Sequence, residues 1–211
     1  MTMDTQREIA ARRSQSYWLL SRLFLEQPDQ PMLDELAIAL RAAPAGDIER
    51  SVELAALEAA VKKALASPHE ITELQVEFTR LLRGVSKVSG ATEPYESVAR
   101  EGRLFGECTE AVAAIYQQAG YQDLVPDAGP PDHMGTELRF MSILCFREME
   151  AWRDGDEAQA RDLLERELSF LEQHVLPWIP QLCDGLAELT THAFYLAVAT
   201  LTAAACRQDG E

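Results

Sequence analysis

Apolar residues recur along this chain at intervals of three and four positions, which is the spacing of one face of an α-helix. Near the N-terminus, Ile9, Arg13, Tyr17, Leu20 and Phe24 fall at intervals of three or four, and the apolar members of this set predict the buried stripe of a first core helix. The same pattern predicts further helices up to about residue 43 and over about 48–66, 68–84, 100–119, 132–149, 156–175 and 190–206. We therefore expect an all-α fold, a single globular helical domain over residues 1–211 with about eight to ten helices.

Proline and glycine mark the breaks between the predicted helices, and two of these breaks are long. The first covers residues 84–98 and the second covers residues 120–131. Long irregular stretches are uncommon inside a compact helical protein, and they often carry function. Both breaks are therefore candidates for a functional surface.

The charge balance narrows the choice of partner. Asp and Glu number 35 against 19 Lys and Arg, which gives a formal net charge of -16. Such a surface repels phosphate backbones and acidic lipid headgroups, so neither nucleic acid nor a membrane surface is an expected partner. No apolar run approaches the ~18 residues of a membrane-spanning helix, so stable membrane insertion is not expected. A basic peptide or protein would instead be attracted.

The segment from Arg12 to Leu20 resembles a twin-arginine export signal. Its apolar part is interrupted by Arg22 and soon followed by Glu26, and no small-residue cleavage site comes after it. We interpret the segment as part of the first core helix, in a protein that is not exported. The four cysteines form neither a CxxC pair nor a zinc-ligand pattern, which favours reduced thiols and a cytoplasmic location.

Few motifs point to catalysis. The phosphate-binding patterns GxxxxGK[ST] and GxGxxG are absent, and so is the nucleophile pattern GxSxG. The segment Asp132-His133-x-x-x-Glu137 would place His133 and Glu137 on one helix face, where a metal ion or a proton transfer would need them. No second motif supplies the remaining metal ligands. A helix cap by Asp132, with Glu137 facing inward or pairing, explains the same residues.

Aromatic residues and prolines gather at the ends of the two long breaks. They are Phe78, Pro94, Tyr95, Pro131 and His133. In one interpretation the two prolines simply end and begin helices. In the other, these residues line a groove for an apolar or extended peptide, and Glu93, Glu96 and Asp132 at its mouth attract basic residues.

Three segments and one late pair of residues carry a family resemblance. Residues 78–84 read FTRLLRG, residues 93–98 read EPYESV, and residues 131–138 read PDHMGTEL. His174 and Trp178 follow four residues apart. In order and spacing these features resemble the TorD/DmsD (NarJ-related) family of cytoplasmic chaperones for twin-arginine-exported molybdenum redox enzymes.

The resemblance implies a TorD-like helical bundle that is not an enzyme. Its partner would be the precursor of a molybdopterin-containing oxidoreductase, bound through the twin-arginine leader or in its apo form. Export would be delayed until the cofactor is inserted and the client is folded. In this reading Glu96 and Asp132 face the leader's arginines. The full set of implied peptide-binding residues is Phe78, Leu82, Pro94, Tyr95, Glu96, Pro131, Asp132, His133 and Glu137.

The resemblance further implies no resident cofactor, with at most weak guanine-nucleotide binding. It implies a monomer or a domain-swapped homodimer, for which residues 120–131 would supply the hinge. Two other functions stay open. One is an adaptor that binds a folded partner subunit, and the other is a metal-dependent hydrolase that uses Asp132, His133 and Glu137.

Overall fold

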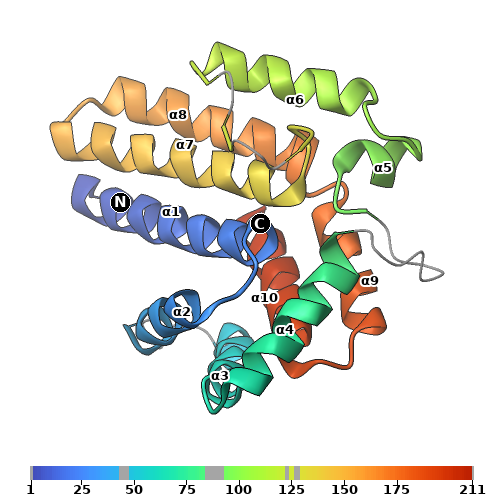
Figure 1. The fold of residues 1–211 in the computed structure, drawn as a ribbon. Helices are drawn as coiled ribbons and strands as arrows, with labels where there is room; N and C mark the ends of the chain where they lie inside the picture. Colours follow the sequence, from blue (N-terminus) through green and yellow to red (C-terminus); the bar gives the residue numbers. More distant parts are fainter. Residues whose placement is uncertain (1, 43–47, 84–92, 122–123, 126–128, 211) are drawn as a thin grey trace. The chain divides into compact units, whose positions relative to one another are not determined.

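The computed structural model describes residues 2–42, 48–83, 93–121, 124–125 and 129–210 (Figure 1). These residues form ten α-helices and one π-helical turn, which confirms the all-α prediction. The elements are α1 (Met3–Leu25), α2 (Gln30–Ala42), α3 (Ile48–Ala64), α4 (Pro68–Leu82), α5 (Glu96–Glu101), α6 (Glu107–Gln118), α7 (Met134–Asp154), α8 (Glu157–Phe170), η1 (Leu171–Val175), α9 (Ile179–Leu189) and α10 (Ala193–Asp209). Within the described residues, no helix combines the length and the apolar composition that crossing a bilayer needs.

Contacts within the chain group into two compact units. Unit 1 contains α1 and residues 95–178, and therefore α5, α6, α7, α8 and η1. Unit 2 contains residues 26–94 and 179–209, and therefore α2, α3, α4, α9 and α10. The single domain expected from the sequence stays a prediction.

Unit 1 is built on the packing of α1 against α7 (Figure 1). The Ser14 hydroxyl donates to the carbonyl oxygen of Ser142 at 2.9 Å, and the Ser142 hydroxyl donates to that of Ser14 at 2.9 Å. Such reciprocal bonds need closely spaced helices. Nearer the other end of this contact, a Cβ on Gly135 would lie 2.5 Å from Leu25 Cγ. Small residues at these positions therefore allow α1 and α7 to approach.

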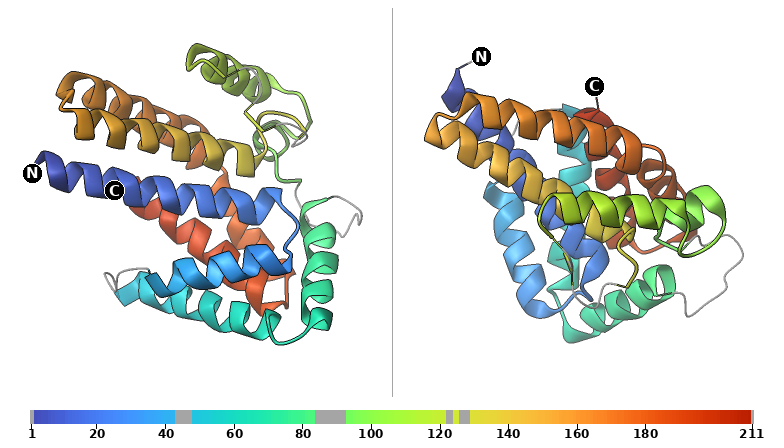
Figure 2. Two further views of the ribbon diagram at one scale, coloured as in Figure 1. Left: turned by 60° about the vertical axis from the view of Figure 1, so that its left-hand side comes forward. Right: turned by 90° about the horizontal axis from the view of Figure 1, so that it is seen from above.

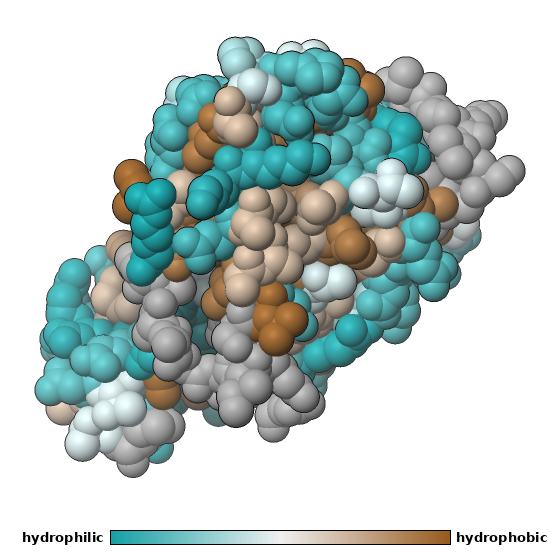
Figure 3. All heavy atoms as spheres, turned by 90° about the horizontal axis from the view of Figure 1, so that it is seen from below, coloured by the Kyte–Doolittle hydropathy of each residue, from teal (hydrophilic) through white to brown (hydrophobic). Residues whose placement is uncertain are grey.

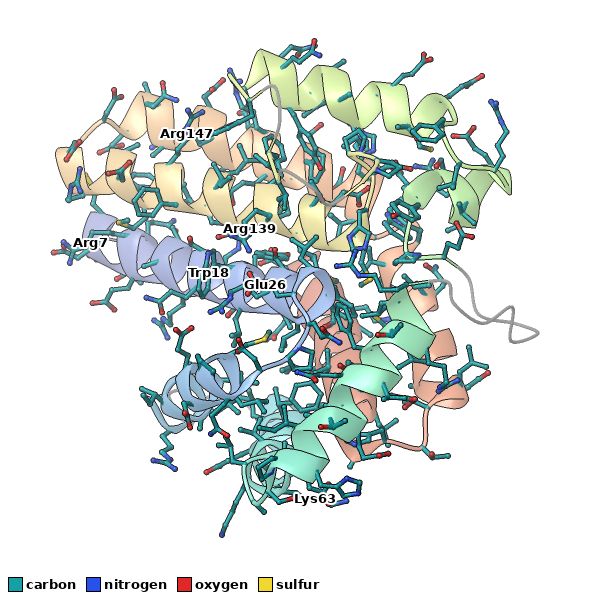
Figure 4. The ribbon with its side chains drawn as sticks, in the orientation of Figure 1. Arg7, Trp18, Glu26, Lys63, Arg139 and Arg147 are labelled. Atoms are coloured by element: carbon teal, nitrogen blue, oxygen red, sulfur yellow. The ribbon has the colours of Figure 1, made fainter. Side chains whose placement is uncertain are left out.

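On the outer side of the same pair of helices, Trp18 of α1 stands beside Arg139 of α7 (Figure 4). The Arg139 guanidinium carbon lies 5.5 Å from the centre of the Trp18 ring, and that of Arg22 lies 4.7 Å from it. Arg139 Nε also donates to the Ser21 hydroxyl at 2.9 Å. Cation–π contacts thus cover part of an aromatic ring that is still 42% exposed.

A buried ionic group connects α8 to the same pair of helices. Arg13 Nη1 lies 2.6 Å from Glu167 Oε2 and 3.5 Å from Glu148 Oε2, while Trp152 Nε1 donates to Glu148 Oε1 at 2.8 Å. Burial raises the pKa of Glu167 to about 7, and the Arg13 charge opposes this rise. Arg13, the polar residue in the apolar stripe of α1, is therefore the half-buried counter-ion of two buried carboxyl groups.

Unit 2 has its core among α2, α3, α4, α9 and α10. The Tyr195 hydroxyl of α10 donates to the carbonyl oxygen of Leu74 in α4 at 3.1 Å. The Glu77 carboxylate accepts from Arg80 and from the Thr190 hydroxyl, each at 2.6 Å. Seen from below, the molecule has a surface on which apolar residues interrupt a mostly hydrophilic covering (Figure 3).

The structure corrects the predicted helix over 100–119. It is two helices, α5 and α6, separated by a loop that starts at Gly102 and ends at Gly106. Gly102 has φ of +72°, which ends α5 in the left-handed region that favours glycine. A Cβ on Gly106 would lie 2.1 Å from Glu101 Oε2. That carboxylate accepts from the first backbone N–H groups of α6, so the loop between the two helices is tightly built.

Three other differences concern the C-terminal half of the chain. The helix predicted over 156–175 changes at Leu171 from α8 into the π-helical η1. The helix α9, whose first residues are Ile179 and Pro180, was not predicted from the sequence. Residues 177–180 read PWIP. Proline is well tolerated in a first helical turn, so this segment both follows η1 and begins α9. The last helix, α10, begins at Ala193 and extends to Asp209.

Candidate functional site

The structure brings most of the sequence-predicted motif residues of unit 1 into one buried cluster. An isolated antiparallel bridge joins Tyr95 to His133, and Glu96 N donates to the carbonyl oxygen of Asp132 at 2.9 Å. Glu96, Asp132 and Glu137 are each 0% exposed. Two segments far apart in sequence thus place three carboxyl groups in the interior of unit 1.

Asp132 stabilises the start of α5. Its Oδ2 accepts from Ser97 N at 2.9 Å, which satisfies one of the backbone donors that a helix leaves open at its N-terminus. The expectation that Asp132 caps the helix following it is therefore wrong. That role belongs to His133, the N-cap of α7, whose Nδ1 accepts from Gly135 N at 3.1 Å. The acceptor role of Nδ1 places the ring N–H on Nε2.

Glu96 and Glu137 connect α5, α7 and η1. His174 Nδ1 lies 3.0 Å from Glu96 Oε2, and Arg100 forms an ion pair with the same carboxyl group. Trp178 Nε1 donates to Glu137 Oε2 at 3.0 Å and to the carbonyl oxygen of His174 at 2.5 Å. His174, one of the late pair of motif residues, is therefore hydrogen-bonded within the fold.

The electrostatics of this cluster favour a proton on Glu137. Burial raises the pKa of Glu137 well above its usual range, and the neighbouring Glu96 carboxylate raises it further. A protonated Glu137 can donate to Glu96, which turns a repulsive contact between two carboxylates into a hydrogen bond. Burial likewise raises the pKa of Tyr116, whose hydroxyl donates to the carbonyl oxygen of Pro131 at 3.3 Å. Tyr116 therefore stays a neutral donor.

The other predicted residues differ in their surroundings. Tyr95 and Pro131 are half-buried in unit 1, and the Tyr95 ring meets the His133 ring edge-on with 5.2 Å between their centres. Phe78, Leu82 and Pro94 belong to unit 2 and are buried there. Residues 84–92 of the first long break, and residues 122–123 and 126–128 of the second break and predicted hinge, lie outside the described residues.

The cluster does not have the arrangement that a metal-dependent hydrolase needs. Asp132 binds the start of α5, His133 Nδ1 binds the start of α7, and Glu137 binds Trp178. Among the described residues, no group of three or more His, Cys, Asp or Glu side chains has the geometry to hold a metal ion. Each side chain of the proposed hydrolase triad thus has a bonding role within the fold.

Some contacts within this cluster were not predicted from the sequence. Arg100 was not singled out, although it stands four residues after Glu96, the spacing at which helical ion pairs form. The late pair of His174 and Trp178 was noticed as a pattern, without its contact to Glu96 and Glu137. Contacts across 78 and 41 residues leave no local signal in a single sequence.

The fold and the buried cluster define a helical protein in which the described motif residues bond its own segments to one another. Comparison with known proteins agrees with this class. Residues 47–184 match the sequence model of the nitrate reductase delta subunit family, which is well over half of the chain. The chain belongs to this family, and it is a redox-enzyme maturation chaperone of the TorD/NarJ kind, not an enzyme.

Individual relatives support this assignment. The chain is 27% identical over 206 residues to the chaperone protein TorD of Vibrio vulnificus strain YJ016, covering 95% of this chain and 94% of that protein. It is 41% identical over 66 residues to the chlorate reductase assembly chaperone protein of Ideonella dechloratans, covering 31% and 33% of the two chains. The crystal structure of a putative redox enzyme maturation protein from Archaeoglobus fulgidus has the same fold, with a TM-score of 0.54, 20% identity, and 89% and 90% coverage.

Proposed function

We propose that this chaperone binds the precursor of a molybdopterin-containing oxidoreductase in the cytoplasm through the precursor's twin-arginine leader. It holds the precursor back from export until the cofactor is inserted and the enzyme is folded. The observation that supports this most is the similarity to TorD chaperones over 95% of the chain. The net charge of -16 supports it as well, because a leader with two adjacent arginines is attracted to an anionic surface.

The predicted peptide-binding residues have two kinds of role in this proposal. Tyr95 and Pro131 are half-buried, so they touch the leader directly. Glu96, Asp132 and Glu137 are buried, so they act indirectly, by holding α5, α7 and η1 in place. His133 belongs with them, since it caps α7 and supports the Tyr95 ring. Phe78, Leu82 and Pro94 are buried residues of unit 2, and they stay proposed peptide-binding residues of that unit.

The test is affinity capture from the cytoplasm of the source cells, with the captured proteins identified by mass spectrometry. We expect one unexported molybdoenzyme precursor, with peptides that cover its intact leader. Capture of the mature enzyme alone would overturn leader binding in favour of an adaptor for a folded subunit. A leader-deleted precursor that is captured as well as the intact one would do the same.

A further inference from the structure

In unit 1, α6 runs beside α7 and α8 (Figure 2). A groove of about 270 Å³ is lined by residues of these three helices and of η1. Its apolar lining consists of Ile115 from α6, Phe140 and Leu144 from α7, and Phe170 from α8. The volume lies just below the ~300 Å³ at which ordinary small-molecule sites begin. It suits a few apolar side chains of a peptide better than a nucleotide-sized cofactor.

A polar side chain stands at one end of this groove. His174 lines the groove, and its side chain is 8% exposed. Its Nδ1 is bonded to Glu96, and its ring stacks on that of Phe170 with 5.1 Å between the centres. No other hydrogen bond joins the His174 ring to a described residue, so Nε2 is available to a ligand in the groove. This nitrogen is a fixed polar anchor next to an apolar floor.

The rim of the groove is acidic. Asp162 and Glu165 of α8 both line it, and Asp162 is paired with Arg166 at 2.8 Å. Glu165 is exposed and forms no ion pair with any residue that the structure describes. The Glu165 carboxylate is therefore an uncompensated negative charge at the mouth of an apolar groove. A ligand that joins apolar side chains to a cationic group complements both features.

We propose that this groove binds the apolar stretch of the twin-arginine leader, with Glu165 facing one of the leader's guanidinium groups. The inference rests on the proposed function and adds a location to it. His174 Nε2 bonds the peptide backbone, which fixes the depth and register of the apolar side chains. The buried motif residues then act on the leader through His174, because Glu96 and Arg100 hold the turn that carries it.

The test uses a fluorescein-labelled synthetic peptide in which two adjacent arginines precede about twelve apolar residues. A second peptide has glutamines in place of the arginines. Fluorescence anisotropy with the full chain gives the Kd of each. Glu165→Lys and Ile115→Ser are the groove variants. Glu188→Lys and Val76→Ser are their matched controls, since Glu188 and Val76 are exposed residues of unit 2.

We expect Ile115→Ser to weaken the binding of both peptides about tenfold, because it removes apolar contact area from the groove. We expect Glu165→Lys to weaken the arginine peptide about fivefold and the glutamine peptide less than twofold, because only the arginine peptide loses an ion pair. Both controls should keep the wild-type Kd. Unchanged thermal unfolding of each variant establishes that the effects are not losses of fold.

The outcomes separate this inference from the proposed function. If the wild-type chain prefers the arginine peptide and both groove variants keep its Kd, the groove assignment is overturned and leader binding stands. If the wild-type chain binds the two peptides equally or binds neither, leader recognition fails and the groove assignment fails with it. If a control weakens binding as much as its groove variant, the location is again refuted.

Discussion

Replacing Gly135 by alanine tests the close contact on which unit 1 is built. In α7 the added Cβ would lie 2.5 Å from Leu25 Cγ, 3.0 Å from Leu25 Cδ2 and 3.2 Å from the backbone oxygen of Ser21. Real Cβ atoms do not approach other atoms to 2.5 Å, so α1 and α7 must separate or Leu25 must leave its position. Overpacking of this kind costs roughly 1–3 kcal/mol. The higher helix propensity of alanine returns up to about 1 kcal/mol.

The net expectation for Gly135→Ala is a loss of about 1–2 kcal/mol in the free energy of unfolding. For a chain of this length that loss lowers the Tm by roughly 2–8 °C. Urea unfolding followed by circular dichroism measures the free energy, and a thermal scan measures the Tm. The close approach of α1 explains why the motif PDHMGTEL has a glycine at position 135.

Gly185→Ala is the matched control, because it makes the same substitution within α9. A Cβ on Gly185 would meet nothing within 4 Å, so only the helix propensity changes. We expect this variant to gain about 0.5–1 kcal/mol. Opposite signs for the two variants support the contact geometry. Equal stabilisation of both would refute it, since it would mean that α1 and α7 are not in close contact at Gly135.

Three further predictions concern charge, capping and backbone strain. The pKa of Glu167 is about 7 in the folded chain and near 4.5 in the unfolded chain, so the folded state binds this proton more tightly. The resulting stabilisation, about 3 kcal/mol in the free energy of unfolding, is complete below pH 4.5 and is lost as the pH rises through 7. Urea unfolding at pH 5, 6 and 7 should show a steeper fall for the wild type than for Glu167→Gln; parallel curves would contradict this. Asp132→Ala should lower the free energy of unfolding by about 1–2 kcal/mol, because Ser97 N loses its acceptor, and an unchanged urea midpoint would exclude the capping role. Phe105 has φ of +58°, so Phe105→Gly should be about 1 kcal/mol more stable than Phe105→Ala in the same assay; equal stabilities would show that residue 105 is not held in the left-handed region.

Local patterns were sufficient for the helices with a clear apolar stripe. The stripe of α1 depends on residues close together in sequence: Tyr17, Leu20 and Phe24 are buried as predicted, while Ile9 is half-buried. The predicted start of α4 at residue 68 is also present, with Ser67 as its N-cap. The break between α5 and α6 was missed because Leu104 and Phe105 continue an apolar spacing across it. Their side chains are 40% and 68% exposed, so the apolar letters there mark a loop surface and not a core.

The candidate site shows the same division between local and distant interactions. The motif residues around Asp132 could be singled out, because their order and spacing are visible in the sequence. Which helix Asp132 caps could not be inferred, since its bonding partner Ser97 is 35 residues away. The burial of Glu96 could not be predicted from the sequence either. A glutamate is rarely fully buried, and its place in the interior depends on His174 and Arg100 being there to pair with it.

By itself the sequence determined the helical class, the anionic surface and the family, because helix periodicity, net charge and motif spacing are properties of the chain as written. Only the tertiary structure decided what the motif residues touch. A buried carboxyl group needs donors or a proton, and those donors come from α5, α7 and η1 only once these elements have packed together. The groove beside His174 likewise exists only where α6 comes to lie alongside α7 and α8.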